Sequence, residues 1–88
     1  MYSNGMTPND ALQKAIAMFA DKDGKGGVPG LARAIGYGIT RVDNMMRRRM
    51  ANPDLPLPAT WGLKIELATG GKVKRGQLCP DVPWKHLT

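Results

Sequence analysis

Apolar residues recur at helical spacing from the start of this 88-residue chain. Thr7 can cap a first helix, Pro8 suits the first helical position, and Asp10 places negative charge in the first turn. Five apolar residues then share one face: Leu12, Ala15, Ile16, Phe19 and Ala20. The polar, glycine-rich segment 21–27 stops the pattern, so we expect the first helix to end there.

Two shorter periodic segments follow, separated by glycine. The first runs from about Val28 to Ile35, with Leu31, Ala34 and Ile35 as its apolar stripe. Gly36 stands where a left-handed turn residue is required. The second runs from about 39 to 48, with Val42, Met45 and Met46 facing inward. Two short helices joined by a tight turn are the usual device for placing one helix in the major groove of DNA.

The remainder of the chain predicts one more full helix and a short turn. The segment 51–57 contains two prolines and is expected to be a loop. Pro58 begins a helix that reaches Thr69, with Trp61, Ile65 and Ala68 on one face, and the Gly70-Gly71 pair closes it. Leu78, Val82 and Trp84 are expected to pack a final short turn against the rest. Because strand signals are weak, we predict an all-α bundle of four to five helices, similar to the lambda-repressor fold.

We expect one domain, over residues 8–84, with a flexible N-terminus at 1–7 and a C-terminal tail at 85–88. Thirteen Lys and Arg against seven Asp and Glu give a net charge of +6, which favours a polyanionic partner. No apolar run approaches the roughly 20 residues of a membrane span. With no signal peptide in evidence and a lone cysteine, Cys79, read as a buried apolar residue, a cytoplasmic location is expected.

Nothing in the sequence favours an enzyme, a metal site or a cofactor. A single cysteine cannot form an intrachain disulfide, and no cysteine–histidine cluster suits zinc. His86, the only histidine, lies in the tail without a suitably spaced nucleophile. The glycines of segment 23–27 lack the spacing of a phosphate-binding loop.

The spacing of the central segment has a mechanical reason. Ala32 lies where the two helices should cross closely, and Gly36 makes the turn. Ordinary helical hairpins use alanine and glycine in the same way, so the spacing by itself also allows a purely structural role. Gly30, inside the first of these helices, costs about 1 kcal/mol relative to alanine.

The residues from 10 to 84 resemble the Cro-like and YdaS-type antitoxin family of small prophage regulators. The resemblance rests on Gly26-Gly27, the segment 31–36, the proline-started helix at Pro58, the segment 65–73 that contains Thr69-Gly70-Gly71, and the tail from Leu78 to Trp84. The tail discriminates best, because a generic hairpin would not predict it. Three positions depart from the family pattern: Gly38 replaces serine or threonine, Met45 an aromatic residue, and Cys79 an arginine.

The resemblance implies that the exposed face of helix 39–48 contacts DNA bases. Asn44 can pair with adenine through two hydrogen bonds, while Thr40 and Ile39 can meet a thymine methyl. Asp43 could accept a hydrogen bond from cytosine or pair with Arg47 one turn later, and we favour the pair. The expected phosphate contacts are Arg41, Arg47, Arg48 and Arg49. Each of these side chains could instead be an ordinary solvated residue.

These observations predict a sequence-specific regulator of transcription, of the Cro-like repressor type, that binds double-stranded DNA. The resemblance implies a homodimer on a palindromic operator, with half-sites about 10 base pairs apart or a multiple of that. The fourth helix and the tail are our candidates for the dimer surface. One alternative is an antitoxin-type module that neutralises a partner protein, with DNA binding secondary. Another is an unspecific nucleic-acid or RNA binder.

Overall fold

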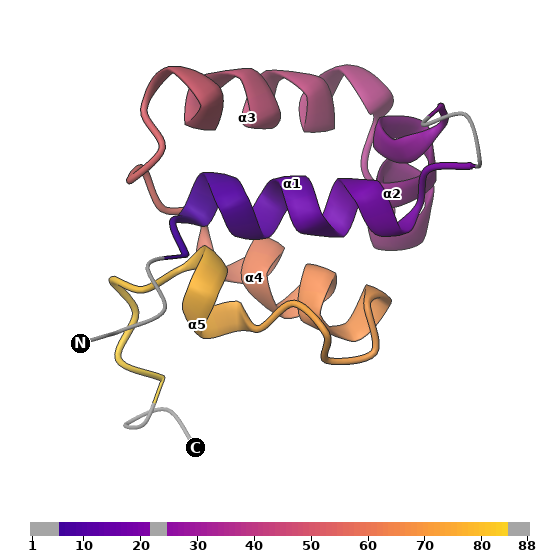
Figure 1. Ribbon diagram of the computed structural model, residues 1–88. Coiled ribbons are helices and arrows are strands. Elements are labelled where there is room, and N and C mark those ends of the chain that lie inside the picture. Colours follow the sequence, from indigo (N-terminus) through magenta and orange to yellow (C-terminus); the bar gives the residue numbers. More distant parts are fainter. Residues whose placement is uncertain (1–5, 22–24, 85–88) are drawn as a thin grey trace.

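The computed structural model describes residues 6–21 and 25–84, which fold into five helices without a strand in that part of the chain. The helices are α1 (Pro8–Met18), α2 (Gly27–Ile35), α3 (Ile39–Ala51), α4 (Ala59–Ala68) and α5 (Arg75–Leu78). Figure 1 shows α1 in the middle, with α3 on one side of it and α4 and α5 on the other. The helix α2 packs against α1, α3 and α4 and so joins the two sides. The predicted all-α class and the predicted order of helices are confirmed.

The start of α1 is as the sequence predicts. The Thr7 hydroxyl accepts a hydrogen bond from the Asp10 amide at 3.1 Å, and the Asp10 carboxylate accepts one from the Thr7 amide at 3.2 Å. This reciprocal capping box satisfies two N–H groups that the first turn leaves without intrahelical partners. Thr7 therefore belongs to the folded domain. The rest of the expected flexible N-terminus, apart from Met6, lies outside the described residues, as does the tail 85–88 with His86.

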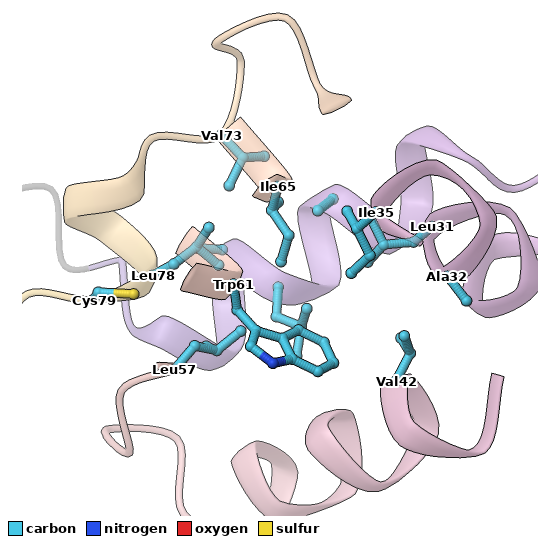
Figure 2. Close-up of a cluster of buried hydrophobic side chains, with 13 residues drawn as sticks. Leu31, Ala32, Ile35, Val42, Leu57, Trp61, Ile65, Val73, Leu78 and Cys79 are labelled. Atoms are coloured by element: carbon cyan, nitrogen blue, oxygen red, sulfur yellow. The ribbon is translucent and has the colours of Figure 1, made fainter. Parts of the chain in front are cut away.

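The core is built around Trp61, whose side chain is only 2% exposed. Figure 2 shows its indole ring in the middle of a cluster to which every helix contributes. The buried apolar residues are Ala11, Leu12, Ala15, Leu31, Ala32, Ile35, Val42, Leu57, Trp61, Ile65, Val73, Leu78 and Cys79. The predicted burial of Cys79 is confirmed, and burial raises the pKa of its thiol to about 11.

Three helical glycines, Gly27, Gly30 and Gly62, are close-packing positions. A Cβ added at Gly30 would lie 2.9 Å from the Cβ of Phe19, and one added at Gly62 would lie 2.7 Å from the sulfur of Cys79. Real Cβ atoms do not approach so closely, so α2 meets the end of α1, and α4 meets α5, at distances that only glycine permits. This close contact with Phe19 explains why glycine, a residue of low helix propensity, occupies position 30 inside α2.

Three features differ from the sequence-based expectation. The helix α3 continues three residues past Arg48, to Ala51, and the amide of Asn52 still donates to the Arg48 carbonyl at 3.0 Å. Ala34, expected in the apolar stripe of α2, is exposed. The helix α1 ends at Met18, because Phe19 and Ala20 donate to carbonyls three residues back and form a tighter turn.

In the part of the chain that the structure describes, no helix has the length and apolar character needed to cross a membrane.

Candidate nucleic-acid interface

The turn between α2 and α3 has the predicted geometry. Gly36 adopts the left-handed conformation, with φ of 79°, and its amide donates to the Ala32 carbonyl at 2.9 Å. The Tyr37 amide donates to the same carbonyl at 3.0 Å. Gly38 then returns to an extended conformation and precedes α3 without a side-chain cap. The three residues 36–38 therefore change the direction of the chain and start α3 against α2, as a helix-turn-helix requires.

The face of α3 that points away from the bundle is polar and basic. Its exposed residues in the first three turns are Ile39, Thr40, Arg41, Asn44, Arg47 and Arg48. Val42 is the fully buried apolar residue of this helix, and Met45 and Met46 are half-buried against the core. The predicted division of α3 into an inward and an outward face is confirmed for these positions.

Asp43, the one acidic residue of α3, is engaged within the helix. Its carboxylate lies 2.7 Å from the Nε of Arg47, one turn later, and forms an ion pair with it. The carboxylate raises the pKa of the Arg47 guanidinium, because it stabilises the charged form. Of the two roles considered for Asp43, the structure contains the intrahelical pair.

Tyr37 is a residue of this surface that the sequence analysis did not single out. The guanidinium of Arg41 lies 4.4 Å from the centre of the Tyr37 ring, which in turn lies 4.7 Å from the Trp61 ring. The Lys64 ammonium is 5.5 Å from the same ring on the side of α4. Stacking on a ring anchored to the core restrains Arg41 near the start of α3. The sequence contained one signal for Tyr37, which is that an aromatic residue stands between the two glycines of the turn.

Arg49 is placed differently from the other arginines. Its side chain is 5% exposed, and its guanidinium donates to the Pro56 carbonyl at 2.6 Å and to the Met45 carbonyl at 3.4 Å. The bond to Pro56 ties the end of α3 to the loop before α4. The exposure expected for a phosphate contact is therefore wrong for Arg49, whose side chain is reached only from the hollow that it lines. The signal was the spacing of 42, 45 and 49, which puts Arg49 on the inward face of a helix.

A hollow of about 580 Å³ lies along the C-terminal half of α3 and extends to the start of α4. Its lining residues are Arg41, Asn44, Met45, Arg47, Arg48, Arg49 and Pro58. The hollow thus brings together Asn44 and all four arginines singled out from the sequence. Ile39, Thr40 and Asp43 lie outside its lining. Because no carboxylate lines it, the hollow suits an anionic group.

Across residues 6–21 and 25–84, no group of three or more histidine, cysteine, aspartate or glutamate side chains could hold a metal ion.

Comparison with known proteins adds the family. The family model described as bacterial toxin YdaS matches residues 13–87, which is most of the chain. No curated protein and no solved structure matches the chain. The matched region begins inside α1 and includes the helix pair α2–α3, the helix α4 and the tail that carried the resemblance seen in the sequence. The chain belongs to the YdaS family, which is described as a family of bacterial toxins rather than antitoxins.

Proposed function

We propose that this protein is a sequence-specific transcriptional regulator of the Cro-like repressor type that binds double-stranded DNA through α3. The observation that carries the proposal is the outward face of α3. It follows a left-handed glycine turn, it is polar and basic, and its one carboxylate is already paired. A helix held in this way can enter the major groove, which is about 12 Å wide.

The positions of the side chains support separate roles for the two ends of α3. Asn44 and Thr40 are exposed and one turn apart, so both can face base edges, with Ile39 beside them for contact with a thymine methyl. Arg47 and Arg48 are exposed further along the helix and suit phosphates. Arg41 also suits a phosphate, because stacking on Tyr37 restrains its guanidinium.

The experiment is a binding measurement on DNA from upstream of the protein's own gene, against a scrambled duplex of equal length and composition, at two salt concentrations. The proposal predicts a marked preference for the upstream duplex that persists at the higher salt concentration. Equal affinity for both duplexes would favour the unspecific nucleic-acid binder instead. Absence of binding to either duplex would refute the proposal.

We further propose that the DNA-binding form is a homodimer on a palindrome and that α4 supplies its contact surface. Leu63 and Leu67 lie one turn apart on the outward face of α4 and are 40% and 83% exposed. A two-fold axis requires one surface to match itself, and such a pair of leucines can pack against its own copy. Reading a palindrome then places the two α3 helices one DNA turn apart, about 34 Å.

A second candidate function is binding to a partner protein as part of a toxin–antitoxin system. The family description and the exposed leucines of α4 favour it. Purification of the protein together with the products of its neighbouring genes separates the two candidates. A stable one-to-one complex that no longer binds the upstream DNA would favour the partner-binding function.

A further inference from the structure

Two of the arginines that line the hollow along α3 have neither an acidic nor an aromatic partner among the described residues. Four arginines line the hollow, and the other two have such a partner. Arg47 is paired with Asp43, and Arg41 is stacked on Tyr37. Within the described part of the chain, neither Arg48 nor Arg49 forms an ion pair. The hollow therefore carries positive charge that the protein itself leaves without a counterion.

The missing counterion is most unfavourable for Arg49, because the guanidinium of this residue is buried. Its hydrogen bonds go to the uncharged carbonyls of Pro56 and Met45, and its Nε is buried without a hydrogen-bond partner. A guanidinium remains charged at physiological pH, so burial does not remove the charge by deprotonation. Desolvation, followed by the nearby charge of Arg48, lowers the pKa of Arg49, which is the direction expected for a charge without compensation. Buried charges are ordinarily paired.

The shape of the site sets what can supply the missing charge. The hollow of about 580 Å³ could hold one phosphate group with room for water, and Asn44 at its edge adds an amide that can donate. Arginine binds phosphate in a forked arrangement of two hydrogen bonds, which a chloride ion cannot use. Pro58 and Met45 give the hollow an apolar side, which strengthens electrostatic interactions within it.

We propose that the hollow between the C-terminal half of α3 and the start of α4 is a phosphate-binding site, in which Arg48 and Arg49 together hold one phosphate group. The group can come from two sources, a DNA backbone diester or a free phosphate. With the first source, the site deepens the proposed DNA-binding function by fixing the register of α3. With the second, a bound free phosphate would compete with DNA for the same arginines.

The first arm of the test measures thermal unfolding in inorganic phosphate against chloride at equal ionic strength. The variants are Arg48→Gln, Arg49→Met and, as a control, Arg33→Gln, which removes an exposed arginine of α2 outside the hollow. A free-phosphate site predicts that phosphate raises the melting temperature of the wild-type protein and of the control. The expected rise is about 4–8 °C once phosphate reaches a few times its dissociation constant. This rise should be lost in the two hollow variants.

The second arm measures binding of a DNA duplex as a function of salt concentration. A backbone-phosphate site predicts that Arg48→Gln and Arg49→Met each reduce the slope of log K against log salt by about 1, whereas Arg33→Gln leaves it unchanged. Because Arg48 is exposed, Arg48→Gln keeps this arm decisive even if Arg49→Met destabilises the fold. The quantity measured in this arm is the change of DNA affinity between salt concentrations, not the stability of the variant.

The proposal is overturned if neither arm responds to the hollow variants, or if Arg33→Gln changes both readouts as much as they do. The outcome is separable from the proposed regulator function. Sequence preference is measured on upstream against scrambled DNA, whereas the phosphate site is measured by thermal unfolding and by the salt slope. A protein without sequence preference that still shows the phosphate response retains the site and loses the regulator function.

Discussion

The helices α3 and α4 differ in how much apolar surface their inward faces bury and in what their outward faces expose. The inward face of α4 carries Trp61 and Ile65, both almost fully buried, and its outward face carries the exposed Leu67. The inward face of α3 has Val42 as its fully buried apolar residue, and its outward face is polar and basic. Apolar burial is the main favourable contribution to folding. The fold therefore depends more on the buried side chains of α4, while α3 buries fewer apolar side chains and presents charge to the solvent.

This difference indicates how a chain of 88 residues can present a basic helix face to the solvent. A domain of this size buries a limited apolar area, so each helix can contribute only a few buried apolar side chains. Here the glycine turn and the contacts of α3 with α1 and α2 fix its direction. Arg49 adds a hydrogen bond to the Pro56 carbonyl that holds the end of α3 to the following loop. Backbone geometry and hydrogen bonds thus compensate for a small apolar face.

The largest expected effect tests the inward faces. Trp61→Ala should lower the free energy of unfolding by about 3–5 kcal/mol, because it removes a buried indole and leaves a cavity. Val42→Ala should lower it by about 1–3 kcal/mol, since less buried surface is lost. Urea titrations followed by circular dichroism measure both values. Equal losses, or a larger loss for Val42→Ala, would contradict the division of labour between α4 and α3.

The next effect tests the outward face of α3. Asn44→Ala should relax the preference for one base pair of the operator by about 1–3 kcal/mol, because a bidentate contact to adenine is lost. Arg48→Ala should weaken binding to all sequences alike. Competition binding against duplexes with single base changes separates the two effects. If Arg48→Ala alters preference and Asn44→Ala does not, then the assignment of base reader and phosphate contact is reversed.

The fold was largely predictable because its signals are local. The capping box at Thr7, the turn at Gly36 and the closing Gly70-Gly71 pair each fix the backbone over a few residues. Gly70 and Gly71 both have positive φ, of 64° and 84°, as a helix end of this kind requires. Such signals need only neighbouring residues, so a single sequence contains them.

The site was less predictable because it depends on register and on contacts between distant segments. The run from Arg47 to Arg49 was interpreted as one basic block, although a helix turns successive residues about 100° apart. One arginine of the run is consequently buried while the other two are exposed. The stacking of Arg41 on Tyr37, and of Tyr37 on Trp61, joins segments that only the tertiary structure brings together.

A matched pair of substitutions in the turn before α3 should have opposite effects. Gly36→Ser should destabilise the protein by about 1–2 kcal/mol, because φ of 79° is unfavourable for any residue with a Cβ. Gly38→Ser should stabilise it by a few tenths of a kcal/mol, since its φ of −70° is ordinary and serine can cap α3. A Cβ meets no atom within 4 Å at either position, so packing does not differ. Melting temperatures compare the pair, and a loss of similar size at both positions would refute this account of the turn.

The smallest effect on stability is expected on the outward face of α4. Leu67→Gln should change the free energy of unfolding by less than about 0.5 kcal/mol, because the side chain is 83% exposed in the single chain. The same substitution should weaken self-association, since it replaces an apolar contact at the proposed dimer surface. Sedimentation over a range of concentrations measures this, with the exposed Thr60→Gln on the same helix as the control. If Leu67→Gln and the control dimerise as the wild-type protein does, the dimer surface lies elsewhere. The exposed leucines would then favour a partner protein as the occupant of this face.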